Sequence, residues 1–111
     1  MEKYLIYDFN DDYGREPIIR KAKNGTLICI FLTGGTWEPQ NKNVVKIMKS
    51  YDDGKTWTKP TILFSHHSRG VWSPEMFLNN DKIILMIIVI LIREHIYNYL
   101  KVKMVLIGLR K

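Results

Sequence analysis

Residues 50–57 read Ser-Tyr-Asp-Asp-Gly-Lys-Thr-Trp, and this octet decides how the chain is expected to fold. The Asp52 carboxylate can accept hydrogen bonds from backbone N–H groups two residues on, as in an Asx-turn. Gly54 supplies the positive φ that a chain reversal requires, and Thr56 is expected to begin the next strand. Trp57 then brings a large apolar ring beneath the turn. The octet therefore predicts a tight hairpin that an aromatic side chain anchors to a sheet.

The octet also matches a longer pattern than an ordinary Asp-Gly hairpin needs. The Asp-box pattern Ser-x-Asp-x-Gly-x-Thr-Trp is met at Ser50, Asp52, Gly54, Thr56 and Trp57, with its spacing intact. Asp boxes recur in the blades of sialidase-like β-propellers, where they are folding devices and carry no chemistry. The chain is therefore similar to that family at its most specific motif.

The sequence on both sides of the octet resembles the same family. Residues 14–19 (Gly-Arg-Glu-Pro-Ile-Ile) resemble the Arg-x-Pro segment that opens the first sialidase blade. Residues 24–27 (Asn-Gly-Thr-Leu) resemble the hairpin that follows it, and residues 57–60 (Trp-Thr-Lys-Pro) continue as those blades do. The resemblance covers about residues 13–82, somewhat under two thirds of the chain.

Strand signals dominate this part of the chain. Runs of β-branched, aliphatic and aromatic residues predict strands at 17–21, 26–33, 44–50 and 61–64. Residues 65–73 are expected to form a polar crossover, and 75–78 with 82–85 would open a second group of strands. The predicted fold class is all-β, with antiparallel four-stranded blades of a six-bladed sialidase-like β-propeller.

The chain is too short for a complete propeller. A propeller needs roughly 4–8 blades of about 40–50 residues each, so 111 residues hold at most two blades. The propeller is therefore expected to be incomplete and the chain to be a fragment of a longer protein. Residues 1–82 are interpreted as the first blade and the start of the second, and residues 83–111 as an apolar and basic tail of uncertain structure.

The tail begins with ten consecutive Ile, Leu, Met and Val residues at 83–92. This run is too short for a membrane span, which needs about 20 residues, and it lacks an amphipathic period. A buried strand or helix of this purity is expected to fit poorly after half-polar strands. A one-base slip near residue 85 is an alternative: with AAA for Lys101 and ATT for Ile107, the shifted frame would encode a second Asp-box-like hairpin. The tail would then have no evolved function.

The resemblance implies a role for Arg15. In sialidases the Arg of the Arg-x-Pro segment belongs to a cluster that holds the substrate carboxylate, and a guanidinium fork meets two oxygens at once. The family usually has Ile where this chain has Glu16. Because an acid would weaken anion binding there, the substrate could be a different sugar, and a surface Arg at a strand end is the plainer interpretation. In sialidases an acid/base Asp lies in the loop after the second strand. The corresponding loop here, residues 34–39, has no Asp, and Glu38 is its only carboxylate.

Three further residues are candidates for contact with a sugar. Trp37 could stack on the apolar face of a sugar ring or simply cover the sheet edge. Glu75 is the candidate catalytic carboxylate, because it lies where the inner strand of a second blade would begin. Arg69 is a candidate substrate-binding residue on the preceding crossover, together with His66 and His67, although solvated loop residues are the simpler interpretation.

Charge and residue spacing argue against nucleic-acid binding and against a metal or cofactor site. The net charge is +6, but residues 93–111 contain five basic residues against one acid, and no basic stripe interleaves with aromatics. No nucleic-acid binding is therefore expected. Adjacent histidines would point opposite ways on a strand, and no zinc spacing or phosphate loop occurs, so no metal or cofactor is expected. The lone Cys29 is expected to be buried.

Residues 1–10 lack the features of a signal peptide, which leaves the localisation undetermined. The sequence as a whole predicts a fragment of a sialidase-like glycoside hydrolase that acts on sialic acid or a related sugar and is inactive by itself. The alternative is a non-catalytic carbohydrate-binding or interaction propeller. A third, weaker hypothesis makes residues 83–111 a tail that attaches to a membrane surface, although a membrane partner is not favoured.

Overall fold

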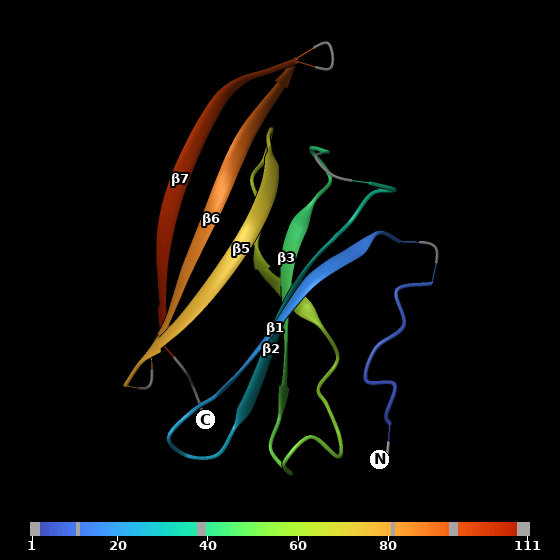
Figure 1. Cartoon of the computed structure of the whole chain (residues 1–111), viewed down its shortest axis with the longest axis vertical. Helices are drawn as coiled ribbons and strands as arrows, with labels where there is room; N and C mark the ends of the chain where they lie inside the picture. The colour runs from blue at the N-terminus through green and yellow to red at the C-terminus, as the bar shows by residue number, and fades with distance from the viewer. Residues whose placement is uncertain (1–2, 11, 38–39, 81, 94–95, 109–111) are drawn as a thin grey trace.

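The computed structural model of the chain describes residues 3–10, 12–37, 40–80, 82–93 and 96–108. These residues form seven β-strands and no helix (Figure 1). The strands are β1 (Gly14–Lys21), β2 (Leu27–Thr33), β3 (Val44–Ser50), β4 (Thr61–Phe64), β5 (Gly70–Asn79), β6 (Lys82–Arg93) and β7 (Ile96–Gly108). The predicted all-β class with antiparallel sheets is confirmed.

The first sheet is an antiparallel meander in the order β1-β2-β3-β4. The turn between β1 and β2 is closed by backbone hydrogen bonds from Ala22 N to Thr26 O (2.8 Å) and from Gly25 N to Ala22 O (3.0 Å). Gly25 has a φ of 89°, which this turn requires and which glycine adopts without strain. The strands β3 and β4 have the bounds that the sequence predicts, with the octet in the turn between them.

A bulge interrupts the edge strand β1. The register with β2 shifts between Arg15 and Ile18, and Glu16 has a φ of 55°. Pro17 follows it and has no N–H to donate, so a regular ladder could not run through this point. The β1 strand nevertheless begins at Gly14, earlier than residue 17, because Gly14 and Arg15 pair with Thr33 and Leu32.

The second sheet has the order β5-β6-β7. Its first strand begins at Gly70, so the predicted polar crossover to residue 73 is wrong at its end. Gly70 and Val71 pair with β6, and a register shift between Trp72 and Glu75 accommodates Pro74. No strand signal is present in the sequence here, because the residues at this point favour turns. Pairing with β6 brings this stretch into the strand.

The apolar run at 83–92 is a strand within this sheet. Alternate residues of β6 are buried, namely Ile83, Leu85, Ile87 and Val89. The sequence predicts that so apolar a strand fits poorly after the preceding strands. This prediction is wrong for the four residues of β6 that point into the core. The predicted boundary between the blade region and the tail, at residues 82/83, falls at the start of β6. The rest of the predicted tail forms β7, which pairs with β6 from Lys82↔Gly108 to Arg93↔Ile96.

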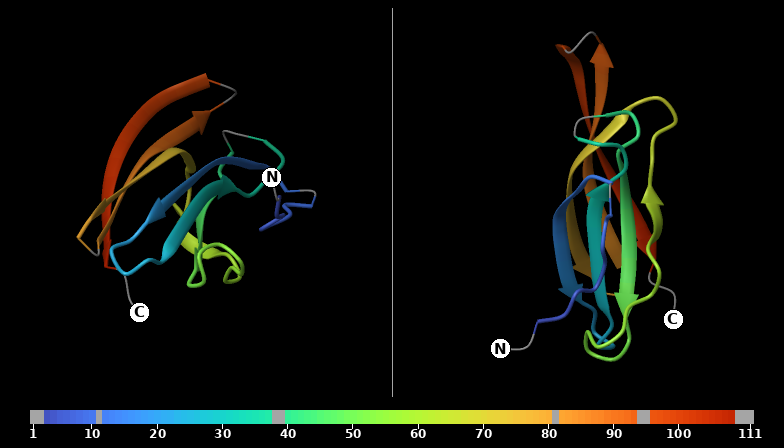
Figure 2. Two further views of the ribbon diagram at one scale, coloured as in Figure 1. Left: turned by 60° about the horizontal axis from the view of Figure 1, so that its bottom comes forward. Right: turned by 90° about the vertical axis from the view of Figure 1, so that its right-hand side faces the viewer.

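The two sheets pack face to face and the main core lies between them (Figure 2). The first sheet contributes Ile28, Ile30, Leu32 and Val45, which are fully buried. The second contributes the four inward residues of β6 together with Val71 and Met76. Strand β5 crosses the first sheet and contacts β1, β2 and β3. The two sheets remain open and do not close into a ring.

The opposite face of the first sheet has a cover of a different kind. The N-terminal segment, residues 3–13 with residue 11 outside the described part, lies over this face (Figure 2, right). Tyr7 and Phe9 pack there on a small buried cluster of Cys29, Phe31 and Met48, which Trp57 covers from the side of the octet. The first sheet is thus the middle layer of the molecule.

Candidate functional site

The octet closes on itself through its polar side chains. The Ser50 hydroxyl donates to Asp52 Oδ1 (2.9 Å) and accepts from Gly54 N (2.8 Å). Asp52 accepts from Thr56 N at Oδ1 (2.8 Å) and from Thr56 Oγ1 at Oδ2 (2.6 Å). Asp53 and Gly54 have φ values of 60° and 90°. These bonds hold a compact loop between β3 and β4.

Two local expectations for the octet are corrected. The Asp52 carboxylate accepts from the backbone four residues on, at Thr56, because the chain makes a wider loop than an Asx-turn. Thr56 belongs to this loop and β4 begins only at Thr61. The hydrogen bonds from the Thr56 hydroxyl and backbone, assisted by Ser50, lower the pKa of Asp52 to about 2.

Trp57 links the loop to the sheet. Its ring is partly buried against the cluster of Cys29, Phe31 and Met48, and its Nε1 donates to Gly54 O (3.0 Å). The next residue, Thr58, is bonded to β3: its N–H donates to Lys49 O (2.8 Å), and its Oγ1 accepts from Lys49 N (2.9 Å). The octet is thereby fixed at one end of the first sheet.

Two of the candidate sugar contacts lie at the opposite end of this sheet. Arg15 is at the start of β1, paired in register with Leu32 near the end of β2. Trp37 follows the end of β2 in the loop to β3, and its side chain is 61% exposed. Tyr13 connects the two regions, since its hydroxyl accepts from Arg15 Nη1 (3.2 Å) and its N–H donates to Gly35 O (2.9 Å).

The loop that presents Trp37 is built around Asn43, which is fully buried. Asn43 Nδ2 donates to Gly34 O (2.6 Å) and to Trp37 O (3.0 Å), while its Oδ1 accepts from Gln40 N (2.6 Å). The role of Asn43 was not among the sequence predictions. The available signal was an Asn directly before a strand, opposite the Gly34-Gly35 pair.

The same loop forms a shallow pocket of about 330 Å³. Its lining residues are Gly35, Thr36, Gln40, Asn41 and Lys42. Gln40 Oε1 accepts from Thr36 N (3.0 Å), and an added Cβ at Gly35 would overlap that Gln40 oxygen. Gly35 also has a φ of 79°, so the pocket wall requires glycine at this position. Glu38, the carboxylate expected here, lies outside the described residues.

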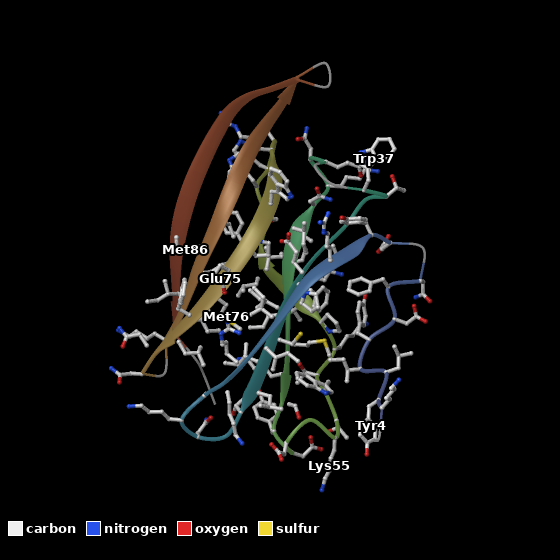
Figure 3. The ribbon with its side chains drawn as sticks, in the orientation of Figure 1. Tyr4, Trp37, Lys55, Glu75, Met76 and Met86 are labelled. Carbon is white, nitrogen blue, oxygen red and sulfur yellow. The ribbon has the colours of Figure 1, made fainter. Side chains whose placement is uncertain are left out.

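Glu75 lies elsewhere. It is in β5, and its Oε1 accepts from Arg20 Nη2 (3.3 Å) and from Met76 N (2.9 Å). Arg20 lies near the far end of β1 from Arg15, and Figure 3 shows Glu75 well apart from Trp37. The structure therefore does not bring the candidate catalytic carboxylate together with the candidate sugar platform.

The crossover before β5 contains the remaining candidates. Arg69 directly precedes β5. The start of β5 lies at the same end of the molecule as the loop between β2 and β3 (Figures 1 and 2). The rings of His66 and His67 stack at 4.5 Å. These residues lie in the crossover loop, as expected, so the opposite orientation of neighbouring side chains on a strand does not apply to them.

Other kinds of site are not seen in the described part of the chain. Its residues contain no group of three or more His, Cys, Asp and Glu side chains placed to hold a metal ion. No helix that could span a membrane occurs among them. Cys29 is buried, and burial raises the pKa of its thiol to about 11, so the thiolate is disfavoured in the folded state.

No protein-family model, no curated protein and no solved structure matches this chain. The candidate site therefore stands on the geometry of its own residues.

Proposed function

We propose that this chain is a two-blade portion of a sialidase-like β-propeller whose parent acts on a sialic acid or a related sugar. The observation that carries the proposal is the octet itself, closed by the Ser50–Asp52–Thr56 hydrogen bonds in the turn between the third and fourth strands of an antiparallel meander. A second antiparallel sheet that packs on the first by its face also supports it, because neighbouring blades of a propeller are stacked in this way.

The sugar-binding end in this proposal is the end of the first sheet opposite the octet. Trp37 offers an exposed indole on a loop that Asn43 holds from within. Arg15 supplies a guanidinium for a carboxylate, and the adjacent pocket offers amide and hydroxyl groups for sugar hydroxyls. An aromatic platform with a few polar groups beside it is the usual composition of a small-molecule site.

Catalysis would require residues beyond this chain. In sialidases a tyrosine backed by a glutamate attacks the anomeric carbon, and these enzymes are exceptions to the two-carboxylate scheme. We therefore expect no turnover of an aryl sialoside or another aryl glycoside by the 111-residue chain. Measurable release of the aryl group by the purified chain would contradict this.

One observation favours the second candidate function, a non-catalytic carbohydrate-binding propeller. Glu75 is engaged by Arg20 and by its neighbouring N–H group, and it lies away from Trp37. A parent sequence with two further inner-strand arginines and a Tyr/Glu pair would identify the enzyme, and their absence would identify the binding module.

The binding proposal is tested by titration of the chain with N-acetylneuraminic acid and with galactose, followed by NMR. We expect weak binding of the acidic sugar, with a Kd on the order of 1 mM, and its loss in Trp37→Ala. Tyr51→Ala is the matched control, because Tyr51 is an aromatic of similar exposure (64% against 61%) at the octet end of the same sheet. Equal effects of the two substitutions, or binding unaffected by Trp37→Ala, would refute the site.

A further inference from the structure

Strand β2 is buried on both of its faces. Ile28, Ile30 and Leu32 point to the second sheet, and Cys29 and Phe31 point the opposite way, with no more than 2% of any of these residues exposed. A strand that is apolar on both faces belongs to the middle layer of a fold. The first sheet therefore needs a cover on each face to keep its apolar surface from water.

The two covers differ in how they are held. A hydrogen-bonded sheet covers the inner face. The outer face is covered by the N-terminal segment through ring contacts: Tyr7 stacks on Phe31 at 5.4 Å, and Phe9 meets Phe31 edge-on at 5.1 Å. The backbone bond from Tyr13 N to Gly35 O (2.9 Å) ties this segment where it enters β1.

The described hydrogen bonds within the segment shape the segment itself. Asp12 N donates to Phe9 O (3.0 Å) and Asn10 N to Asp8 Oδ1 (2.8 Å), which forms a turn directly before β1. Gly14 completes the fit, since an added Cβ would overlap the Phe9 ring. Toward its start the segment leaves the sheet, and Leu5 is 82% exposed.

We infer that the N-terminal segment is a releasable strap that controls access to the outer apolar face of the first sheet and to the Cys29 thiol. Residues 3–10 swing away about the turn before β1, while the two sheets stay folded. Opening of this kind is a local event whose free energy is smaller than that of global unfolding. It uncovers the part of the Cys29, Phe31 and Met48 cluster on which Tyr7 and Phe9 pack, and it leaves Trp57 in place. This inference is independent of the sugar-binding proposal.

Cys29 makes the strap measurable, because it is the only cysteine in the chain. In the closed state burial holds its thiol pKa near 11, so a thiol reagent such as DTNB reacts chiefly through the open state. We expect Phe9→Ser to raise the rate of Cys29 modification about tenfold. This corresponds to a loss of about 1.4 kcal/mol in the free energy that favours the closed strap. Leu5→Ser, in the same segment but exposed, is the control and is expected to leave the rate unchanged.

A second variant and a second readout separate strap release from unfolding. Gly14→Ala pushes on the Phe9 ring without removing it, and it should raise the rate in the same direction. Backbone amides of β2 and β6 should keep their hydrogen-exchange protection in both variants. An unchanged rate in Phe9→Ser and Gly14→Ala would overturn the inference, and so would a faster rate accompanied by loss of β2 and β6 protection.

Discussion

At the scale of single residues, Asp52 organises the octet. It accepts from both the hydroxyl and the backbone of Thr56 and from the Ser50 hydroxyl. These donors favour the ionised carboxylate, and for this reason its pKa falls from 3.8 to about 2. The side chain is exposed, so the effect comes from hydrogen bonding and not from burial.

The lowered pKa of Asp52 predicts a pH dependence of stability. A carboxyl whose pKa is lower in the folded state stabilises the fold above its unfolded pKa, and this contribution is lost as the pH falls through the folded pKa. The window therefore lies between about pH 4 and pH 2. In urea unfolding, Asp52→Asn should be less stable than the parent chain at pH 6, and this difference should shrink toward pH 2. A difference that stays constant across this window would contradict the assignment.

Asn43 holds the loop between β2 and β3 through its side-chain hydrogen bonds. Asn43→Ala leaves the carbonyls of Gly34 and Trp37 without their donor. An unpaired buried polar group costs about 1–3 kcal/mol, so we expect a loss of that order in urea unfolding and a shift of the Trp37 amide resonance. Asn41→Ala, at an exposed position two residues away, is the control and should change neither. Equal behaviour of the two variants would show that Asn43 does not hold the loop.

At the scale of elements, the hairpin of β3 and β4 depends on Trp57. Trp57→Ala would remove the ring that packs on the cluster of Cys29, Phe31 and Met48. Since the ring is only partly buried, we expect a loss of about 2–3 kcal/mol, at or below the lower end of the range for buried aromatic residues. Thermal unfolding measures it.

The matched variant is Trp57→Phe, which keeps a ring against the cluster and removes only the bond from Nε1 to Gly54 O. It should cost about 1 kcal/mol. A melting transition unchanged in Trp57→Ala would mean that the ring does not anchor the octet to the sheet.

At the scale of the whole molecule, the packing of the second sheet on the first decides whether residues from 83 onward belong to the fold. Leu85 is fully buried and the adjacent Met86 is 38% exposed. Leu85→Ala should cost about 2–5 kcal/mol, whereas Met86→Ala should cost clearly less, as urea unfolding would show. Equal, small effects would indicate that β6 does not pack on the first sheet.

That outcome would favour the alternative of a shifted reading frame, which the nucleotide sequence tests independently. The alternative requires AAA at Lys101 and ATT at Ile107, and it predicts that deletion of residues 86–111 leaves the order of residues 13–82 intact. The structure predicts the opposite for the deletion, because Ile87 and Val89 are buried in the core between the sheets.

Much of the first sheet could be predicted because its signals are local. The bounds of β3 and β4 and the octet turn between them follow from β-branched residues, one glycine and one aromatic ring within twenty-one residues. The start of β5 could not be predicted, since Gly70, Ser73 and Pro74 are turn-forming and only the pairing of residues 70–72 with β6 brings this stretch into the strand. The role of Asn43 was missed for a similar reason, because its partners are carbonyls six and nine residues away.

The sequence by itself determined the all-β class and the octet turn between two strands, because turn chemistry and strand alternation act over a few residues. Only the tertiary structure decided which faces meet. It paired Glu75 with Arg20 across 55 residues, turned one half of the apolar run at 83–92 into core, and placed Tyr7 and Phe9 over Phe31. These contacts depend on how two sheets and a terminal segment pack, which no local pattern encodes.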